Sequence, residues 1–466
     1  MYQKVNHETL KFLTDLFGKD RVLVDSDLLE MYTHDETSGL KAQPEVVVRA
    51  TTVEQISKLM KFANERKIPI TPRGAGYGLS GGAVPVWKGI VLSLEKMDQI
   101  LEIDEKNLMV TVEPGVITGK LHESVEEKGL FYPPDPASLD SCTIGGNIAE
   151  NAGGPRAIKY GVTKDYVCGL EAVLPSGEII QLGGKLVKNV TGYDLINLLI
   201  GSEGTLAVVT KAILRLIPLP KVDIDLLVAF NEFQAAADTV SAIIERQILP
   251  STIEFMEQDS LLTCEKYLKK KLPMLEAAAF LLIKLDGNRK EDVEALCETV
   301  GEICLEHNAI DVLVAGDRPT QDRLWEARRI MVEALSDRSP INRMEDIVVP
   351  RARINDFLRE MKKLQEKYEY PIICFGHSGD GNVHVNILKE NRPQDKWEKT
   401  ILKISGEIFD IALALKGQIT AEHGVGATRK RYLKKAVGSK VLKLFRDIKQ
   451  LFDPNNILNP GKIFPE

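Results

Sequence analysis

Residues 73–82 read RGAGYGLSGG, and this glycine-rich stretch decides how the first part of the chain is expected to fold. Its second half has the spacing G-x-G-x-x-G of dinucleotide-binding loops, in which a helix opens at the last glycine and faces the pyrophosphate. Here Pro85 follows, and the chain runs on into the strand-like sequence GIVLSL (89–94). The stretch therefore predicts a nest of backbone N–H groups around an anion, with a merely flexible turn as the alternative.

Two other segments share this wealth of small residues. Residues 134–154 read PDPASLDSCTIGGNIAENAGG, and residues 201–210 read GSEGTLAVVT. Glycine pairs let the backbone approach a flat ligand closely. The apolar end of the second segment suits a strand that lies along an aromatic ring system. The three segments together predict a cofactor site in the first part of the chain.

The composition excludes several classes of protein. The 466 residues suggest about three structural units, at roughly 150 residues each. Sixty basic and 67 acidic residues give a net charge of -7. This charge argues against a nucleic-acid-binding surface and against electrostatic binding to anionic lipids. The longest apolar stretches, such as 277–285, are shorter than the roughly 18 residues of a membrane span. Because the N-terminus is polar at once, we expect no signal peptide, no integral membrane segment and a cytoplasmic location.

The six cysteines are scattered without a C-x-x-C spacing. Disulfide frameworks, thiolate zinc sites and iron–sulfur clusters all need clustered cysteines, so the sequence predicts buried or idle thiols. A redox reaction on this chain therefore has no cluster of its own to carry electrons away.

Up to the proline-rich segment 217–221 the pattern mixes helices with short strands. Helices are predicted at 8–17 and at 51–66, the latter opened by the capping-box spacing Thr51-x-x-Glu54. From 222 to 415 strands and helices alternate as strand–helix–strand, strand–helix–strand, which predicts an antiparallel sheet with helices on one face, close to ferredoxin-like. The predicted helices of this part are 231–247, 290–306, 324–335 and 354–368.

Two histidine motifs lie in the last third of the chain. Residues 376–386 read GHSGDGNVHVN, whose centre is a tight-turn sequence, so a hairpin is expected to place His377 and His384 at one end of the sheet. Strand alternation puts His384 and Asn386 on one face. Residues 421–426 read AEHGVG, where neighbouring Glu422 and His423 point differently. Two imidazoles and a carboxylate suit a divalent metal with open positions.

In their order and spacing, RGAGYGLSGG, the 134–154 segment, KYG (159–161) and GSEGTLAVVT resemble the FAD-binding domain of the vanillyl-alcohol-oxidase/p-cresol-methylhydroxylase (PCMH) superfamily. The resemblance is stronger to its FAD-linked D-2-hydroxyacid dehydrogenase branch, which includes D-lactate dehydrogenases and the glycolate oxidase large subunit. It runs from about residue 20 to 464.

The resemblance implies an α+β fold in three parts. These are a PCMH-type FAD-binding domain at 1–220 (core about 42–220), a ferredoxin-like antiparallel-sheet cap domain for substrate at 221–415, and a C-terminal return segment at 416–466. The return segment is expected to pack back on the FAD domain and complete the active site.

The resemblance also implies which residues bind FAD, with the pyrophosphate on the first glycine loop and the flavin on the other segments. None of His7, His34 or His122 lies in a glycine loop, so non-covalent FAD is expected. The implied FAD-binding residues are Arg73, Gly74, Ala75, Gly76, Tyr77, Gly78, Leu79, Ser80, Gly81, Pro136, Ser138, Thr143, Gly145, Gly146, Asn147, Ala149, Asn151, Gly153, Gly154, Tyr160, Gly161, Gly204, Val208 and Asn459.

For the chemistry, the resemblance implies one divalent metal ion (zinc, iron or manganese) on His377, His384 and Glu422. Asn386 is placed near the substrate and His423 is the catalytic base. Oxidation of a 2-hydroxy acid removes a hydride from Cα and a proton from the hydroxyl. A metal that holds hydroxyl and carboxylate lowers the hydroxyl pKa and orients Cα.

Substrate binding is expected to need a cation and a pocket of defined size. Arg328 matches the branch's carboxylate-binding arginine, with a surface charge on a helix as the alternative. Branch members that act on a longer diacid carry a lysine near the position that Met344 takes here, although Arg343 adjoins it. This favours a small D-2-hydroxy acid such as D-lactate.

The electrons are expected to pass to electron-transferring flavoprotein subunits, because the chain resembles the dehydrogenase subunit of lactate dehydrogenase–electron-transferring-flavoprotein complexes. Quinone or oxygen is the alternative acceptor, and glycolate or another 2-hydroxy acid the alternative substrate. An electron-transfer flavoprotein subunit without its own substrate is disfavoured by the metal motif. A metal-dependent hydrolase would leave the glycine segments unexplained, and an NAD-dependent dehydrogenase lacks its loop helix.

Overall fold

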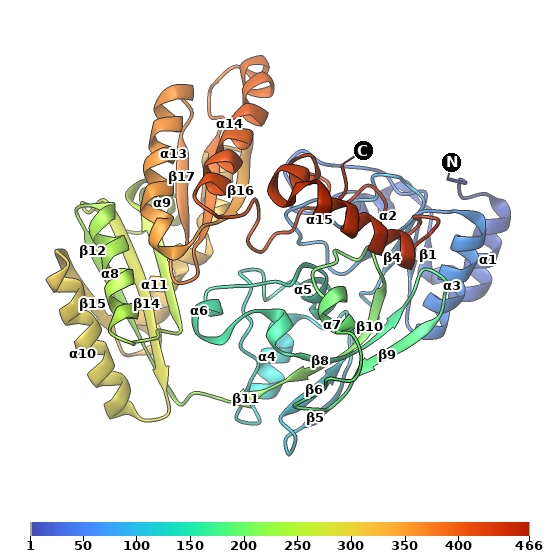
Figure 1. Cartoon of the computed structure of the whole chain (residues 1–466), viewed down its shortest axis with the longest axis horizontal. Coiled ribbons are helices and arrows are strands. Elements are labelled where there is room, and N and C mark those ends of the chain that lie inside the picture. The colour runs from blue at the N-terminus through green and yellow to red at the C-terminus, as the bar shows by residue number, and fades with distance from the viewer. Residues whose placement is uncertain (1, 466) are drawn as a thin grey trace. The chain divides into compact units, whose positions relative to one another are not determined.

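The computed structural model describes residues 2–465, which divide into two compact units (Figure 1). Unit 1 holds residues up to 153, 162–219 and those from 422 onward, and unit 2 holds 154–161 and 220–421. The chain thus passes into unit 2 inside the proline-rich segment 217–221 and returns to unit 1 at Glu422.

Unit 1 is built on two sheets (Figure 1). The first has the order β1 (Val22–Leu23), β2 (Val46–Arg49), β4 (Ile90–Ser93), β3 (Ile70–Arg73), and its last three strands pair in parallel. The second is antiparallel, in the order β5 (Ile100–Asp104), β6 (Met109–Val112), β10 (Val208–Arg215), β8 (Val167–Val173), β9 (Ile179–Gly183). A small third pair joins β7 (Leu130–Phe131) to β11 (Ile217–Pro218).

The predicted helices at the start of unit 1 are present. Helix α1 spans His7–Phe17 and ends at Gly18, and α3 spans Val53–Arg66. The expected cap of α3 is wrong by one residue, because Thr52 accepts the bond from the Gln55 backbone while Thr51 bonds the Gln55 side chain. The remaining helices of unit 1 up to residue 219 are α2 (Ser26–Leu29), α4 (Thr118–Glu126), α5 (Ile144–Glu150) and α7 (Leu195–Leu199).

The last segment of unit 1 packs along the first sheet of the same unit. Helix α15 (Lys430–Phe452) is kinked at Gly438, where φ is +77°. After it, the Asn459 N–H donates to Ile70 O (2.7 Å), so the tail runs beside β3. The buried Lys449 ammonium donates to Thr205 O (2.8 Å) and thereby fixes α15 to the GSEGT segment.

Unit 2 contains a seven-stranded sheet whose pairs are all antiparallel. Its order is β15 (Ala309–Ala315), β12 (Val222–Phe230), β14 (Ala279–Gly287), β13 (Thr252–Glu257), β17 (Ile372–His377), β18 (Asn382–Leu388), β16 (Asn342–Val348). The first four have the order 4-1-3-2 of a ferredoxin-like unit, as predicted, and the last three extend that sheet.

Helices cover both faces of this sheet, so the expectation of one covered face is wrong. On one face Phe233 of α8 meets Phe255 of β13; on the other, Met256 packs with residues of α9, α11 and α12. Adjacent strand residues point to opposite faces, which separates the two layers. The predicted helix 324–335 is broken at Ile330 into α11 and α12, and α9 and α14 were not predicted. The helices of unit 2 are α6 (Ala157–Tyr160), α8 (Phe233–Glu245), α9 (Gln258–Leu268), α10 (Lys290–Glu306), α11 (Arg318–Arg329), α12 (Met331–Arg338), α13 (Ile354–Tyr368) and α14 (Gln394–Ala414).

Among residues 2–465, no helix has both the length and the apolar content that crossing a bilayer requires. All six cysteines are free thiols, and only Cys168 is not buried.

Candidate active site

The predicted histidine hairpin forms in unit 2. Strand β17 ends at His377 and β18 begins at Asn382, so residues 378–381 make the turn. His384 is therefore the third residue of its strand, and it lies opposite Phe375. Both histidines are buried, and their ring centroids are 5.3 Å apart with the planes at 86°. The register brings both imidazoles to one face of the sheet.

A buried carboxylate that the sequence reasoning missed supports His377. Glu254 of β13 lies opposite His377 of β17, and its Oε1 lies 2.5 Å from His377 Nδ1. Its Oε2 accepts a 2.6 Å bond from Arg328 Nε. Burial alone would raise the pKa of Glu254, but Arg328 and His377 lower it below its ordinary value. A glutamate inside the apolar strand sequence TIEFM was the available signal.

A second buried carboxylate, Asp346 of β16, lies opposite His384 of β18. Asp346 Oδ1 lies 3.8 Å from His384 Nδ1 and accepts a bond from the Asn382 amide (2.8 Å). Its Oδ2 accepts bonds from the Thr420 hydroxyl and the Ala421 N–H, both at 2.8 Å. Ala421 is the last residue of unit 2, so the Asp346 carboxylate holds the backbone directly before Glu422.

Arg328 is not a surface charge. It lies on α11 and is only 6% exposed, with its guanidinium 5.0 Å from the centre of the Phe375 ring. The ion pair with Glu254 satisfies Nε, and the two Nη groups are the fork that binds carboxylates bidentately.

Asn386 and Met344 lie opposite each other on β18 and β16, in register positions that share a face with His384. The Asn386 amide lies 3.5 Å from Ile373 O. Arg343, the neighbour of Met344, points to the other face, where its Nε donates to Glu345 and to Ser405 of α14. Of Arg343 and Met344, the two residues at the predicted substrate position, only Met344 lies on the same face of the sheet as the histidines.

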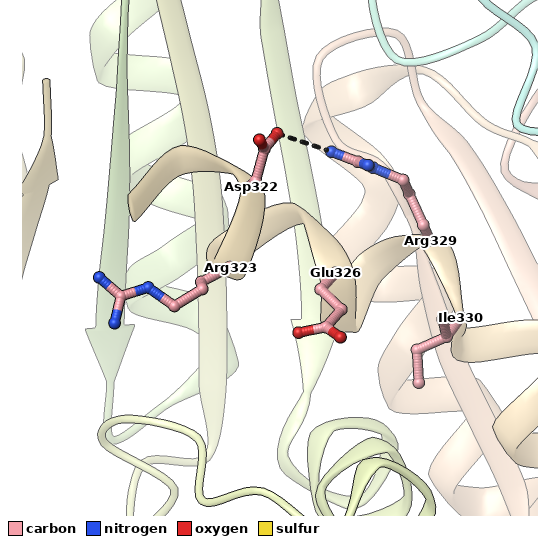
Figure 2. A pocket seen from close by; sticks show the side chains of 5 residues that line it. All are labelled: Asp322, Arg323, Glu326, Arg329 and Ile330. Carbon is pink, nitrogen blue, oxygen red and sulfur yellow. Dashed lines mark ion pairs between the residues drawn. The ribbon is translucent and has the colours of Figure 1, made fainter. Parts of the chain in front are cut away.

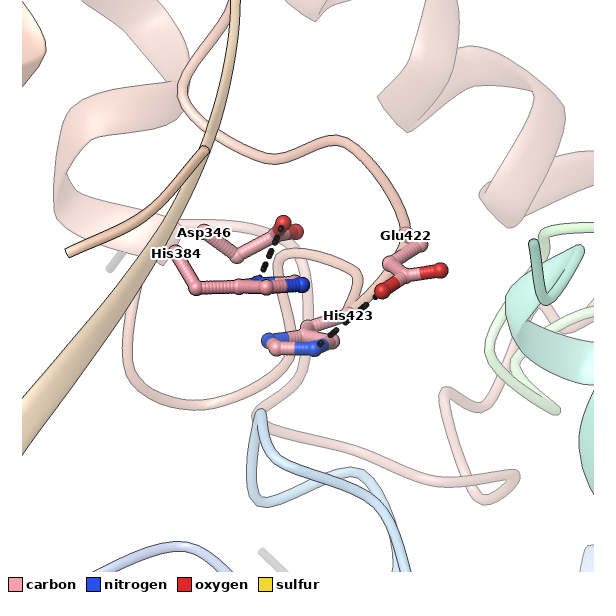
Figure 3. Close-up of side chains that lie close together, drawn as sticks. All are labelled: Asp346, His384, Glu422 and His423. Carbon is pink, nitrogen blue, oxygen red and sulfur yellow. Dashed lines mark ion pairs between the residues drawn. The ribbon is translucent and has the colours of Figure 1, made fainter. Parts of the chain in front are cut away.

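Glu422 and His423 begin the last segment of unit 1. Glu422 Oε1 lies 3.8 Å from His423 Nε2, and Figure 3 shows this ion pair as well as that of Asp346 with His384. These four side chains carry imidazole and carboxylate groups, the ligand types of divalent cations. Within unit 1 the Glu422 carboxylate lies against Gly153, where an added Cβ would come within 3.0 Å of Oε2.

The loop after His423 is anchored to the cofactor segments of unit 1. Glu203, in GSEGT, accepts bonds from the backbone N–H groups of Val425 and Gly426, both at 2.7 Å. The Ala427 N–H donates to Ser80 O at 2.9 Å. The sequence reasoning assigned GSEGT to the flavin alone and did not find this role of Glu203.

The glycine loop 74–82 lies between β3 and β4, with no helix after it, as predicted. The Arg73 side chain donates to Met31 O and His34 O, so its guanidinium holds the neighbouring loop. Thr143 caps α5 and lies so close to Gly74 that an added Cβ there would come within 2.3 Å of Thr143 Oγ1. The first two predicted FAD segments therefore meet.

The Asn459 side chain, 2% exposed, joins the first and third segments by donating to Gly82 O (3.0 Å) and Glu203 O (2.9 Å). The Asn147 amide is engaged internally, with Thr118 Oγ1 at 2.7 Å. Asn151 ends α5 in a left-handed conformation and accepts a bond from the Lys164 N–H. These hydrogen bonds fix the three side chains within unit 1.

Three predicted FAD-binding residues, Gly154, Tyr160 and Gly161, fall in unit 2. There the Tyr160 hydroxyl donates to Asp286 of β14 at 2.8 Å, and Lys159 pairs with the same carboxylate. The other predicted FAD-binding residues lie in unit 1.

Unit 1 has buried polar atoms that fit a polar cofactor. Ser80 Oγ and Glu150 Oε2 are buried, and neither has a hydrogen-bond partner among the described residues. Burial, with Glu203 and Asp35 nearby, raises the pKa of Glu150 well above its ordinary value. Hydroxyl and carboxyl groups of this kind suit the ribityl and ring-edge atoms of a flavin.

A pocket of about 280 Å³ also lies on α11, lined by Asp322, Arg323, Glu326, Arg329 and Ile330 (Figure 2). Arg329 and Asp322 form an ion pair across it, at 3.6 Å. None of the predicted site residues lines this pocket, so it does not contribute to the site.

Comparison with known proteins agrees with these observations. Residues 44–183 match a family described as FAD binding domain, and residues 219–463 match one described as FAD linked oxidases, C-terminal domain. The chain is 45% identical to the glycolate oxidase subunit GlcD of Bacillus subtilis (93% of this chain, 92% of the relative). It is 39% identical to a D-lactate dehydrogenase of Anaerostipes hadrus (99% and 98%) and 33% to a D-2-hydroxyglutarate dehydrogenase of Stutzerimonas stutzeri (97% and 98%).

Solved structures share the fold. A p-cresol methylhydroxylase superposes with a TM-score of 0.80 at 21% identity (99% of this chain, 98% of the other), and a 4-ethylphenol oxidase of Gulosibacter chungangensis with 0.79 at 18% (100% and 99%). The PCMH-type fold expected from the sequence is thereby confirmed. With the C-terminal family model matching more than half of the chain, and relatives covering nearly all of it, the chain belongs to the FAD-linked oxidase family, in its branch of 2-hydroxyacid dehydrogenases and oxidases.

Proposed function

We propose that this chain oxidises a small D-2-hydroxy acid, D-lactate first among them, to the 2-oxo acid, with non-covalent FAD and one divalent metal ion. The observation that carries the proposal is the hairpin of β17 and β18. It holds two imidazoles 5.3 Å apart, and each turns its Nδ1 side toward a buried carboxylate. In metal-binding histidines, a carboxylate that is hydrogen-bonded to the second ring nitrogen, as Glu254 is to His377, orients the ring.

The proposed metal ligands are His377, His384 and Glu422. Asp346 is better suited as an anchor, because its oxygens already accept three hydrogen bonds, from Asn382 and the segment 420–421. Through the bond to Ala421, Asp346 holds the chain one residue before Glu422. Two imidazoles and a carboxylate suit zinc, iron or manganese.

The metal, when bound, supplies a Lewis acid that acidifies the substrate hydroxyl, and FAD, when bound, supplies the hydride acceptor. Arg328 binds the substrate carboxylate through its Nη groups, and its burial strengthens this charge-assisted pair. His423 takes the hydroxyl proton on an imidazole nitrogen, and Asn386 orients the substrate by its amide. Ser80, Glu150 and the backbone of loop 74–82 hold FAD.

Met344 favours a substrate with a small apolar side chain, because it is an uncharged residue on the face of His384. D-lactate meets this requirement. Glycolate, which has no side chain on Cα, is the second candidate because a relative at 45% identity is named a glycolate oxidase subunit. For the electrons, we propose electron-transferring flavoprotein subunits as acceptor, with quinone or oxygen as the alternative.

The test is anaerobic addition of D-lactate, L-lactate or glycolate to the purified yellow protein. We expect D-lactate to bleach the flavin's visible absorption, and a protein that none of the three bleaches would refute the proposal. To identify the electron acceptor, the chain is purified from its native source together with any bound flavoprotein subunits. Lactate-dependent NAD reduction by this preparation is then assayed with and without reduced ferredoxin. Electron transfer to quinone as fast as to any added flavoprotein would exclude the flavoprotein partner.

A further inference from the structure

We propose that Glu254 is a positioning residue that fixes the substrate-binding arginine and one metal-binding histidine to each other; this inference rests on the proposed function. Glu254 has no exposed surface, and its two oxygens are divided between two partners. Oε2 accepts from Arg328 Nε at 2.6 Å, and Oε1 pairs with His377 Nδ1 at 2.5 Å. All three residues belong to unit 2.

The bond to Glu254 determines which nitrogen of His377 carries the ring proton. An ionised carboxylate has no proton to donate, so the hydrogen of this bond is on Nδ1. In the neutral ring Nε2 then carries the lone pair, which is the form that binds a metal. Without an acceptor at Oε1, the proton is no longer held on Nδ1.

The same carboxylate orients Arg328. Its bond to Nε fixes the plane of the guanidinium, which also lies 5.0 Å from the Phe375 ring centre. The bond to Glu254 uses Nε, so the end of the guanidinium that is formed by the two Nη groups keeps its N–H donors for a second carboxylate. Arg328 comes from helix α11 and His377 from strand β17, so Glu254 is the hydrogen-bonded link between two elements.

This link has a consequence for substrate selection. In the proposed reaction Arg328 binds the carboxylate while the metal on His377 holds the hydroxyl. A single side chain that is bonded to both therefore sets the spacing between the two groups.

The substitution E254Q tests the link, because an amide of the same size accepts at only one of its two ends. If the amide oxygen faces Arg328, its NH2 meets His377 Nδ1 and favours the wrong tautomer. If the oxygen faces His377, the NH2 opposes Arg328 Nε and displaces the guanidinium. At least one of two quantities, metal affinity or KM, must therefore change.

The first measurement is titration of the metal-free, FAD-loaded protein with Mn2+, which reads binding without turnover. The second is steady-state kinetics with D-lactate at saturating metal. Loss of the carboxylate behind a metal-bound histidine weakens metal binding about 10- to 100-fold. We expect E254Q to raise the Mn2+ dissociation constant or the KM by about tenfold or more, and E254D, which keeps two acceptors, to lie between E254Q and the wild type.

The matched control is E257Q on the same strand. The Glu257 side chain lies on the other face of the sheet from Glu254, where it accepts a hydrogen bond from the Cys374 N–H (3.0 Å). E257Q should therefore leave the Mn2+ dissociation constant and the KM within threefold of wild type. FAD content and circular dichroism verify the fold of each variant. If E254Q does not fold, E254D is compared with E257D in the same two measurements.

The inference is overturned if both quantities stay within threefold of wild type in the folded Glu254 variant, or if E254D is no better than a folded E254Q. Failure of the proposed function looks different. In that case no hydroxy acid bleaches the wild-type flavin, and the Mn2+ dissociation constants of E254Q and E257Q, which do not depend on turnover, still test the link to His377.

Discussion

Glu203 Oε2 accepts a 2.7 Å hydrogen bond from the backbone N–H of Gly426, which ties the GSEGT segment to the loop that follows His423. Glu203 Oε1 accepts the neighbouring Val425 N–H in the same way. Burial raises the pKa of Glu203, and these two bonds, which favour its ionised form, oppose the rise. Through this carboxylate, a segment that is predicted to bind the cofactor also positions the proposed base.

The substitution E203Q should release one of the two N–H groups, because an amide offers one acceptor oxygen. We expect kcat for D-lactate to fall about 10- to 100-fold, since small misplacement of a reacting group has effects of this size. Steady-state kinetics check this. E171Q is the control, because Glu171 bonds Thr210 and Gln181 on the second sheet; equal losses in both variants would contradict the assignment.

FAD should leave the protein on denaturation without proteolysis. The reason is that no histidine lies within the glycine loops that carry the predicted contacts. After precipitation with acid, the yellow colour is expected in the supernatant. Flavin that stays with the precipitated polypeptide would exclude non-covalent binding.

The variants H384A and E422A should leave a yellow, folded protein that D-lactate no longer reduces. His384 lies in unit 2, whereas loop 74–82 is in unit 1, so H384A leaves the FAD segments intact. Glu422 lies in unit 1 against Gly153, and E422A removes its carboxylate without changing a predicted FAD-binding residue. Chelation of the wild-type protein should have the same effect, and added zinc, iron or manganese should restore turnover. Full activity after verified metal removal would contradict the metal site.

Introducing a cation with M344K should shift the substrate preference toward a 2-hydroxy diacid. Met344 lies opposite Asn386 on the face of the histidines, while the neighbouring Arg343 is occupied by Glu345 on the other face. We expect kcat/KM for D-2-hydroxyglutarate relative to D-lactate to rise about tenfold or more, the size of one charge-assisted bond. R343K, on the opposite face, should leave the ratio unchanged.

Glu257 should make the protein less stable as the pH rises. Burial raises its pKa to about 7, against 4.5 as a reference. The folded state therefore binds a proton that the unfolded state has lost, and the associated stability is present below pH 4.5 and is lost as the pH rises through 7. This amounts to at most about 3 kcal/mol.

Urea unfolding between pH 5 and 8 measures this effect. E257Q removes the titrating group. The free energy of unfolding of E257Q minus that of the wild type should therefore increase as the pH rises, and this difference should level off above pH 7. A constant difference across this range would rule out the shifted carboxyl.

Local sequence was enough for several elements and for the motifs of this protein. The ranges 290–306 and 354–368 are helices with the predicted bounds, because apolar spacing is a local property. The sequence likewise predicted the glycine loop without a following helix, the hairpin between His377 and His384, and an antiparallel sheet close to ferredoxin-like. The family followed from the order and spacing of the motifs, which do not depend on how the chain packs.

The tertiary structure alone decided which side chains support the histidines. Glu254 lies 123 positions before His377, and only the pairing of β13 with β17 brings them together. Asp346 meets His384 by the register of β16 and β18, and Glu203 meets Gly426 across 223 positions. The sequence around a carboxylate in a strand does not indicate its distant partner, because burial and register are set by how the elements pack. A glycine loop or a turn, in contrast, can be predicted locally, because its residue types follow from the backbone conformation at that position.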